Sequence, residues 1–273
     1  MRAYLTAMRL QGIVPNFWSS AAYLERAGAR ELTQGHLVWL EASGVPLFPP
    51  LSHSGDAVPP HTWPKPYCWS DFSNLPAPEG EKRSELDLEY IYLPSNFLRM
   101  EGGHWSVFRK NSRKFPRDNP GFVYTNEVSL EWETLEKLFR DWMAKFNEDA
   151  IIHDAQVMLL YLADIAEQGT TVNFGWKALV SSNGELVGIN VWDRNWHYTN
   201  FRYCICSSRY RFLSEYLRLL FYTDSTVAKI GLPVCDGGIL DRKELMHFKD
   251  KMNPASVRVV YSWGDEPEDS DGD

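Results

Sequence analysis

An acidic residue stands at the end of a short apolar run in residues 232–254, LPVCDGGILDRKELMHFKDKMNP. Asp236 precedes Gly237 and Gly238, and the segment that follows has the apolar spacing of a helix. A carboxylate at the end of a strand can orient or deprotonate an attacking amine. It can equally cap the turn through its short side chain, so both roles stay open. Lys249, on the predicted helix, can pair with Asp236, bind a donor phosphate or lie on the surface.

Residues 109–117, RKNSRKFPR, form the densest positive run of the chain. On a helix, Arg109 and Arg113 share one face, and Lys110 lies next to them. Such a face suits a phosphate group, whether in coenzyme A, at a tRNA end or in a nucleotide acceptor. A merely solvated face is the alternative. Arg209, which follows a predicted strand, is a second candidate for contact with a donor phosphate.

Other residue types that do chemistry are scattered. Tyr203 lies on a predicted strand, where its hydroxyl can protonate a leaving thiolate, although most strand tyrosines only pack. Cys204, Cys206 and Cys235 can act as nucleophiles in principle, but no His–Asp set is readable beside them. The sequence has no phosphate-loop, G-x-S-x-G or H-E-x-x-H motif and no zinc-ligand spacing. We therefore expect no metal site.

Composition narrows the classes of protein. The 273 residues carry a formal net charge of −8, which disfavours a general nucleic-acid-coating role because phosphate binding needs an excess of Lys and Arg. The acidic segment 264–273 is expected to be disordered. No run reaches the roughly 18 apolar residues of a membrane span, and the start does not resemble a signal peptide. With four scattered cysteines, we expect a cytoplasmic protein with free thiols.

The second half of the chain has clear periodicity. Residues 129–147 and 151–169 have the spacing of one-faced helices, and Gly169 is the predicted end of the second. Residues 176–193 predict two strands joined at Asn183 and Gly184, because Asn-Gly is a hairpin signal. We further predict strands at 122–124, 196–208, 232–235 and 256–263 and helices at 209–224 and 241–252. The fold class is therefore mixed α/β, in the order β-α-α-β-β-β-α-β-α-β.

The first half of the sequence resembles a degenerate repeat of the same unit. Residues 36–51 predict a hairpin about Ser43 and Gly44, 86–93 a strand, and 102–116 a helix ended by Pro116. Residues 59–83 predict a long loop. Equivalent positions in the two halves are 140, 144 and 138 residues apart, for the pairs Val38 and Ala178, Tyr90 and Val234, and Pro116 and Pro254. We predict tandem halves at 1–120 and 121–263, a tail at 264–273 and a ligand cleft between the halves.

The chain, with this order of elements, resembles a known family over residues 36–263. The element order is similar to the GNAT acyltransferase fold, and its doubling resembles the C-terminal domain of phosphatidylglycerol lysyltransferases and the Fem-type aminoacyltransferases. The likeness is carried by the basic helix with Arg109, Lys110, Asn111, Arg113 and Phe115, and by Leu245, Lys249 and Pro254 in the late helix. It implies tandem GNAT-like halves and transfer of an acyl or aminoacyl group.

The chain departs from the family at two places. The late acidic turn of the family usually holds an Asn and several acids, whereas here it reads Cys235, Asp236, Gly237 and Gly238. Acetyl-CoA-using GNAT proteins carry a glycine-rich turn after the fourth strand that cradles the pyrophosphate. Here residues 204–216 read CICSSRYRFLSEY, without glycine, and Ser207 and Ser208 are the predicted caps of the next helix. Acyl-CoA and aminoacyl-tRNA both remain as donors.

The resemblance implies an acyltransferase or aminoacyltransferase. The acceptor would be an amine, less readily a hydroxyl, on a small molecule or a nucleotide-linked compound. We expect Asp236 and Tyr203 in the chemistry, and Arg109, Lys110, Arg113, Lys249 and Arg209 in donor or substrate binding. Two alternatives stay open: a GNAT-like transferase that modifies nucleotides or DNA bases, with tRNA or DNA as partner, and a non-catalytic binding module that retains the fold.

Overall fold

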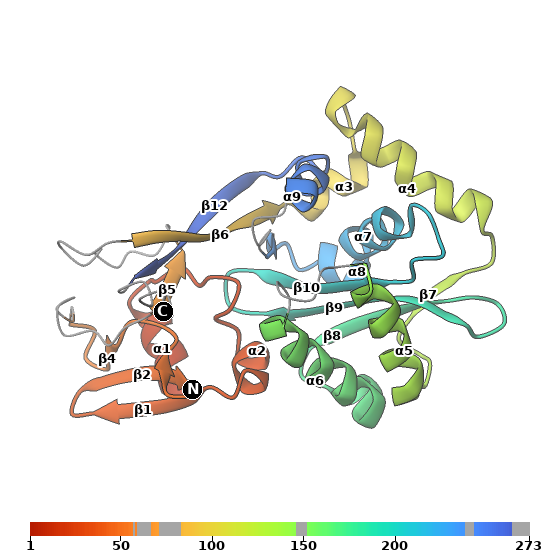
Figure 1. The fold of residues 1–273 in the computed structure, drawn as a ribbon. Helices are drawn as coiled ribbons and strands as arrows, with labels where there is room; N and C mark the ends of the chain where they lie inside the picture. The colour runs from red at the N-terminus through yellow and green to blue at the C-terminus, as the bar shows by residue number, and fades with distance from the viewer. Residues whose placement is uncertain (57, 59–66, 71–82, 146–151, 238–242, 264–273) are drawn as a thin grey trace, which may run out of the picture. The chain divides into compact units, whose positions relative to one another are not determined.

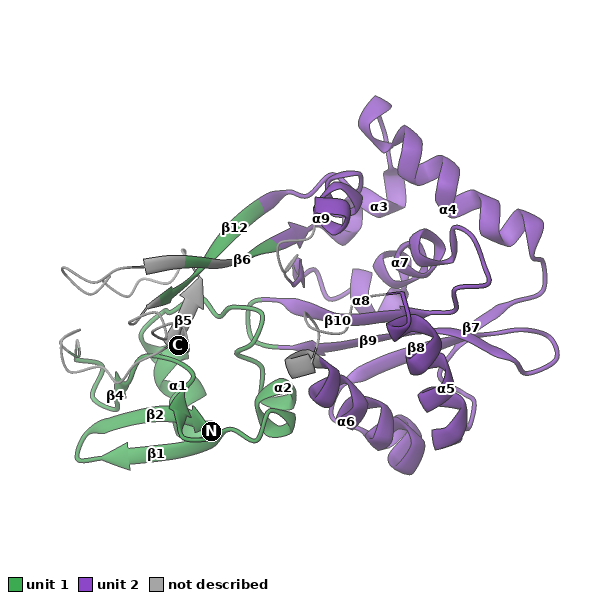
Figure 2. Cartoon of the chain, in the orientation of Figure 1, with its two compact units in different colours: residues 1–89, 195–197, 257–273 green, residues 90–194, 198–256 purple. Residues whose placement is uncertain are grey.

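The computed structural model describes residues 1–56, 58, 67–70, 83–145, 152–237 and 243–263. Two compact units are formed, one from residues 1–89, 195–197 and 257–273 and the other from residues 90–194 and 198–256 (Figure 2). The predicted tail at 264–273 lies outside the described residues, and the tandem halves at 1–120 and 121–263 stay a prediction.

The described residues of the first unit form two helices and a small sheet (Figure 1). The helices are α1 (Arg2–Leu10) and α2 (Ala21–Arg26), and the sheet pairs β1 (Arg30–Gln34), β2 (Leu37–Ala42) and β3 (Val45–Pro46) in that order, with β4 (Leu51–Ser52) also on β2. One face of α1 packs on β2, and Tyr4, Leu24, Val38 and Leu40 are fully buried there. The predicted hairpin about Ser43 and Gly44 is confirmed by the β2–β3 pairing.

A larger sheet has eight strands. Their order is β5 (Tyr67–Ser70), β12 (Ser256–Trp263), β6 (Arg83–Tyr92), β11 (Val234–Asp236), β10 (Thr199–Cys206), β9 (Leu186–Arg194), β8 (Gly175–Val180) and β7 (Val123–Thr125). The predicted loop at 59–83 is wrong at its middle, because residues 67–70 form a strand that pairs with β12. The rest of that loop, except residue 83, lies outside the described residues.

Helices cover both faces of the sheet in the second unit. Figure 1 shows α5 (Trp132–Met143) and α6 (Ile152–Gln168) on one face of β8, β9 and β10, with α7 (Leu213–Thr223) and α8 (Ser225–Ala228) on the other. Leu135, Leu138 and Phe139 bury the apolar stripe of α5, as its spacing predicted. The remaining helices are α3 (Pro94–Arg99), α4 (Ser106–Asp118), α9 (Lys243–Asp250) and the 3₁₀ turns Gly103–Trp105 and Gly169–Thr171.

The predicted element order of the second half is confirmed, with α8 as an addition. The hairpin at Asn183 and Gly184 joins β8 to β9, and α6 ends before Gly169, whose φ of +58° is left-handed. The predicted end of α4 at Pro116 is wrong, because the helix continues to Asp118. Proline costs an interior helix one hydrogen bond, but in the last turn the peptide N–H of Asn119 still reaches the Phe115 carbonyl.

Candidate active site

The strands β10 and β11 run side by side for only three residues. They pair in parallel from Thr199 and Val234 to Phe201 and Asp236. A bulge then bends β10 between Phe201 and Tyr203, and β10 continues along β9 to Cys206, whereas β11 ends at Asp236. Past the bulge, the edge of β10 that faced β11 pairs with no other strand in the described part of the chain. Its peptide groups are therefore available to a ligand.

Asp236 lies where β10 and β11 diverge, and it is only 4% exposed. Its carboxylate accepts a hydrogen bond from the guanidinium of Arg218 on α7, and the Tyr222 hydroxyl, also on α7, lies 3.4 Å from the same oxygen. The ammonium of Lys249 on α9 lies 3.2 Å from the other oxygen, Oδ1, and donates to the Asp236 carbonyl oxygen at 3.3 Å. Of the roles left open for Lys249, the structure shows the pairing with Asp236, and the carboxylate joins three elements.

Two cations surround this one carboxylate in a buried site. Lys249 is 2% exposed and Arg218 is 8% exposed. Aromatic rings line the cations: Phe201 and Phe248 lie 5.0 and 5.2 Å from the Arg218 guanidinium, and Tyr90 lies 5.3 Å from the Lys249 ammonium. The Arg218 Nε has no hydrogen-bond partner among the described residues. The Arg218 Nε–H is therefore a donor that an anionic or oxyanion-forming ligand can use.

Burial and the Asp236 charge both raise the pKa of the Tyr222 hydroxyl well above its ordinary value. The pKa of Tyr92 is raised by the same two causes, in the same order. Tyr92 donates its hydroxyl proton to the Lys249 carbonyl at 2.9 Å, which ties β6 to α9. Both tyrosines therefore stay protonated at neutral pH and act as hydrogen-bond donors.

Two thiols lie on β10 beyond the bulge. Cys204 is half-buried and Cys206 is buried, and both are free. A hydrogen bond between the thiols and burial raise the pKa of Cys204, whereas the same hydrogen bond lowers the pKa of Cys206. The Lys145 ammonium donates to the Cys206 carbonyl at 3.0 Å. The sequence indicated no His–Asp set for these thiols, and their contact with each other was not foreseen.

The connection from β10 to α7 is held by a carboxylate on α5. Asp141 accepts hydrogen bonds from the Ser208 hydroxyl at 2.7 Å, the Ser208 peptide N–H at 2.9 Å and the Ser207 hydroxyl at 3.0 Å. The two bonds from Ser208, foremost among the causes, lower the pKa of Asp141. The prediction that Ser207 and Ser208 cap the helix is wrong, because α7 begins at Leu213 and its N-cap residue is Phe212. Their hydroxyls serve the loop instead.

Phe212 shapes the start of α7. Its φ of +65° is left-handed, which is uncommon for an aromatic residue. The Lys114 ammonium and the Arg211 guanidinium lie 4.2 and 4.8 Å from its ring centre. The Phe212 ring thereby contacts Lys114 of α4 and Arg211 of the preceding loop, and both cations lie near the N-terminus of α7.

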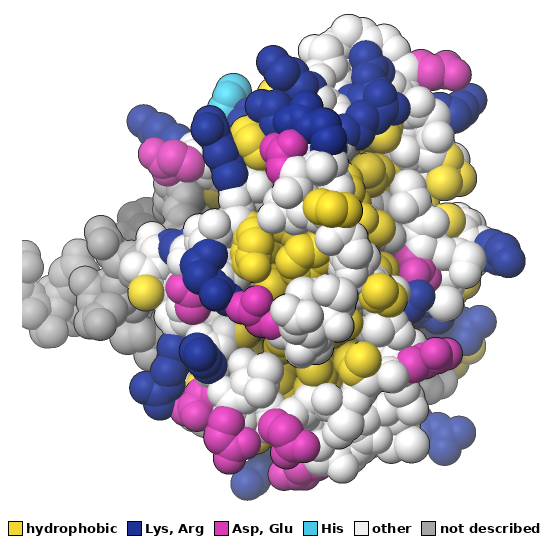
Figure 3. Space-filling view, turned by 90° about the vertical axis from the view of Figure 1, so that its right-hand side faces the viewer, with side chains coloured by type: hydrophobic (Ala, Val, Ile, Leu, Met, Phe, Trp, Pro, Cys, Tyr) yellow, Lys and Arg dark blue, Asp and Glu magenta, His cyan; other side chains and the backbone are white. Residues whose placement is uncertain are grey.

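The remaining predicted site residues lie apart from Asp236. Lys110 and Arg113 are exposed on α4, and Arg109 is half-buried and donates to the Met100 carbonyl. Figure 3 shows Lys and Arg side chains gathered over α4, in the upper part of the view. Arg209 forms an exposed ion pair with Glu185. No hydrogen bond or ion pair in the described residues joins these four cations to Asp236.

Tyr203 is a buried residue whose ring contacts Tyr161 of α6 at 5.7 Å. Because Tyr161 comes from α6, this ring lies on the face of the sheet covered by α5 and α6. Arg218 and Tyr222 were missed by the sequence analysis. The available signal was a charge inside an apolar stripe, because Arg218 follows Leu217 and precedes Phe221 on a helix otherwise rich in leucine and aromatic residues.

Across the described residues, no group of three or more His, Cys, Asp or Glu side chains is placed to hold a metal ion. Nor does that part of the chain contain a helix long and apolar enough to cross a membrane.

Comparison with known proteins shows the fold. A conserved protein of unknown function from Bacteroides thetaiotaomicron matches with a TM-score of 0.69 at 13% identity, over 95% of this chain and 96% of that one. L-PGS from Bacillus licheniformis matches with a TM-score of 0.58 at 14% identity, over 95% and 90% of the two chains. A tandem GNAT protein from the clavulanic acid biosynthesis pathway matches with a TM-score of 0.50 at 10% identity, over 97% and 94%.

No family model and no curated protein matches the sequence. The structural likeness covers nearly the whole chain, and at these identities it shows the fold alone. The chain has the mixed α/β fold of tandem GNAT proteins and of L-PGS, as the sequence resemblance implied.

Proposed function

We propose that the protein transfers an acyl or aminoacyl group to an amine at the place where β10 and β11 part. The observation that carries this is the edge of β10 beyond Phe201, which pairs with no strand of the described residues and lies directly beside the buried Asp236 cluster. Peptide N–H groups along that edge are fixed donors for the oxygen of the acyl carbonyl, on which negative charge develops during attack. Their position costs no reorganisation, because pairing with β9 already fixes the strand.

Asp236 has the acceptor-side role in this proposal. Its carboxylate accepts hydrogen bonds from Arg218 and Tyr222 and is ion-paired with Lys249. It can orient the attacking amine and take the proton that the amine loses as the thiolate of coenzyme A or the ribose hydroxyl of tRNA leaves. Proximity and orientation of donor and acceptor then supply most of the acceleration, as is usual when the donor is already activated. Tyr203, on the opposite face of the sheet, stays a candidate proton donor only through movement of β10.

The donor is an acyl thioester of coenzyme A or an aminoacyl-tRNA. Both carry phosphate groups, and cations stand at two places that suit them: Lys114 and Arg211 on the Phe212 ring at the start of α7, and Lys110 and Arg113 along α4. The loop before α7 contains no glycine, so a pyrophosphate cannot approach its backbone as closely as in glycine-rich turns. This weighs toward the aminoacyl-tRNA donor.

The test is turnover with both donor classes. Native mass spectrometry of freshly purified protein identifies retained coenzyme A or tRNA, and donor panels of acyl-CoA and aminoacyl-tRNA are then assayed with small amines. Asp236→Asn keeps the size of the side chain and removes its charge, and we expect turnover to fall by about 10²-fold or more. Asp250→Asn on α9, at an exposed position, is the matched control. Folded Asp236→Asn protein with unchanged turnover would overturn the role of Asp236.

Failure of both donor classes would instead favour the non-catalytic binding module. Retained ligand without turnover would indicate that the fold binds the donor but does not transfer its group. Circular dichroism and urea unfolding of each variant separate loss of chemistry from loss of structure.

A further inference from the structure

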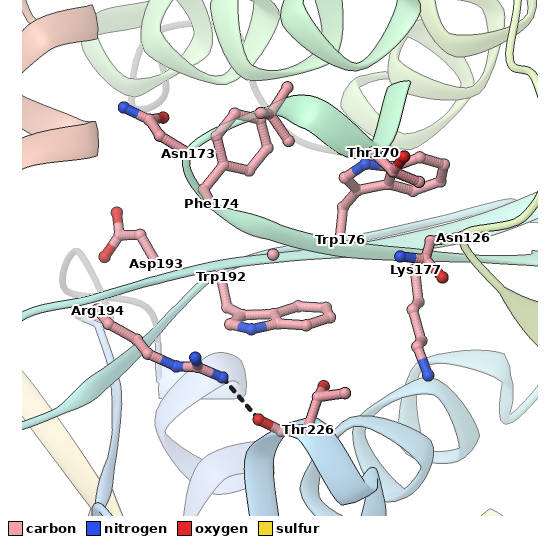
Figure 4. A pocket seen from close by; sticks show the side chains of 12 residues that line it. Asn126, Thr170, Asn173, Phe174, Trp176, Lys177, Trp192, Asp193, Arg194 and Thr226 are labelled. Carbon is pink, nitrogen blue, oxygen red and sulfur yellow. Dashed lines mark hydrogen bonds between the residues drawn. The ribbon is translucent and has the colours of Figure 1, made fainter. Parts of the chain in front are cut away.

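A cavity of about 470 Å³ lies at the edge of the second unit where β8 begins and β9 ends. Its volume is in the range of sites for small molecules. It is lined by the starts of β8 and α8, the end of β9 and the turn after α6, so four elements meet there. Figure 4 shows Trp192 and Arg194 of β9, Lys177 of β8 and Thr226 of α8 on the same side of the strands.

The indole of Trp192 is a buried donor that faces this cavity. The residue is 4% exposed, and its Nε1–H has no acceptor among the described residues. Gly175, its cross-strand partner, lies so close that a methyl group there would stand 2.2 Å from the indole nitrogen. Figure 4 draws that nitrogen on the side of the ring toward Arg194. This N–H is not among the fully enclosed polar atoms of the described residues, so a ligand oxygen can reach it from the cavity.

Arg194 is a cation without an acidic partner in the described part of the chain. One of its N–H groups donates to the Thr226 carbonyl at 2.6 Å, which holds the guanidinium at the cavity. Partial burial lowers its pKa, so water already solvates the charge incompletely. Its other N–H groups are left for a ligand.

The acidic side chains around the cavity, Asp193 and Asp224, already have hydrogen-bond or ion-pair partners. Asp193 accepts hydrogen bonds from Arg202, Asn200 and Tyr161 in the interior. Asp224 pairs with the Lys177 ammonium at 2.6 Å. With these pairs balanced, the charge at the cavity that lacks an acidic partner among the described residues is that of Arg194.

We propose that this cavity binds a small organic acid. Its carboxylate takes the N–H groups of Trp192 and Arg194, which lie on the same side of the strands (Figure 4). A carboxylate fits because it offers two acceptor oxygens to two neighbouring donors and balances the Arg194 charge. A few polar groups that converge on one part of a cavity are the usual make-up of such a site.

The site is separate from the place where β10 and β11 part. Trp192 is paired with Phe201, and Phe201 with Asp236, so the cavity and Asp236 stand two strands apart, about 10 Å. Rings of Phe201 and Phe221 stack between them at 4.1 Å. Organic-acid binding does not require the transferase activity proposed above, and each can fail without the other.

The test uses benzoate as the probe and isothermal titration calorimetry of the full chain. We expect saturable binding of benzoate and none of benzyl alcohol, which has the same ring without the charge. Arg194→Gln is expected to weaken benzoate binding by about tenfold or more, because it removes a charge-assisted pair. Arg140→Gln, an exposed arginine of α5 outside the cavity, is the matched control and should bind as the wild type does.

A second readout locates the ligand. Benzoate should shift one indole N–H signal in ¹⁵N-labelled protein, and that signal should be missing from Trp192→Phe. Absence of benzoate binding at millimolar concentration, equal binding of benzyl alcohol, or undiminished binding by folded Arg194→Gln protein would each overturn the proposal. Phenyl phosphate that binds while benzoate does not would also overturn it, in favour of a phosphate ligand.

Discussion

At the scale of single residues, Asp236 decides whether two buried cations are tolerated. Arg218 and Lys249 are each at most 8% exposed, and Asp236 is the acid within ion-pair distance of both. A buried ion pair need not stabilise a protein relative to an apolar pair, but removal of one partner leaves an uncompensated charge in the interior. Asp236 is therefore a structural requirement of the site whatever its part in the chemistry.

We predict that Asp236→Ala lowers the free energy of unfolding by about 3–5 kcal/mol, since both cations lose their counter-ion. Urea unfolding monitored by tryptophan fluorescence measures it. Asp250→Ala, which removes an exposed acid at the end of α9, should stay within about 0.5 kcal/mol of the wild type. An Asp236→Ala protein as stable as that control would show that the cations are solvated rather than buried.

Gly175 is a residue whose missing side chain matters. A Cβ at this position would stand 2.1 Å from the Trp192 ring, and that ring is itself fixed by Phe221 at 5.4 Å. We predict that Gly175→Ala costs about 1–3 kcal/mol of unfolding free energy through overpacking. In Gly103→Ala the added methyl group meets nothing within 4 Å, so its thermal unfolding should match that of the wild type. Equal stability of the two variants would contradict the close packing of Trp192 on β8.

At the scale of elements, the loop between β10 and α7 depends on one carboxylate from α5. Three hydrogen bonds from Ser207 and Ser208 converge on Asp141, and they fix the residues that lead into Arg211 and Phe212. This loop sets where the cations at the start of α7 lie. Its order is therefore a condition for any phosphate contact there.

Loss of the Asp141 charge should loosen this loop. The pKa of Asp141 is lowered in the folded protein, first by the Ser208 hydroxyl, so its stabilising contribution is present above the ordinary pKa of about 4 and is lost as pH falls through the folded value. We predict faster amide exchange at residues 207–212 in Asp141→Asn at neutral pH, and the same change in the wild type only well below pH 4. Asp164→Asn on α6 is the control. Unchanged exchange in Asp141→Asn would contradict the loop's dependence on this carboxylate.

Elements defined by local signals were predictable from the sequence. The Asn183–Gly184 hairpin, the stop at Gly169 and the apolar stripe of α5 each follow from residues adjacent in the chain. The strand at 67–70 and the continuation past Pro116 were not predictable, because the first depends on pairing with a distant β12 and the second on the last-turn position of the proline.

In the candidate site, too, features set by nearby residues could be predicted, and features set by tertiary contacts could not. Asp236 and Lys249 are 13 residues apart, in consecutive elements, and their pairing could be proposed from the sequence. Arg218 reaches Asp236 only because α7 crosses the parting strands, which is a tertiary relation that no spacing encodes. The cavity at Trp192 and Arg194 likewise depends on elements that meet only in the folded chain.

At the scale of the whole molecule, the net charge of the chain is negative, whereas one surface of it is positive. The chain carries a net charge of −8, yet α4 presents Lys110, Arg113, Lys114 and Arg117 within two turns and adjoins α7, where Arg211 adds another cation. A negative total repels polyanions at long range, whereas a local basic surface attracts phosphate within about a Debye length, 8–10 Å at ordinary salt. Salt dependence of binding separates the two effects.

We predict that Lys110→Gln/Arg113→Gln weakens tRNA binding and lowers the slope of log K against log salt by about one for each lost phosphate contact. Lys137→Gln/Arg140→Gln on α5 makes the same change in net charge at other exposed positions. It therefore separates the effect of the position of the cations from the effect of net charge. Fluorescence anisotropy with labelled tRNA, repeated from 50 to about 300 mM salt, gives both slopes. An equal loss in the two double variants would assign the effect to net charge, and no loss in either would make α4 a solvated face. A loss of coenzyme A affinity in the α4 variant, with tRNA binding unchanged, would move the donor to the thioester class.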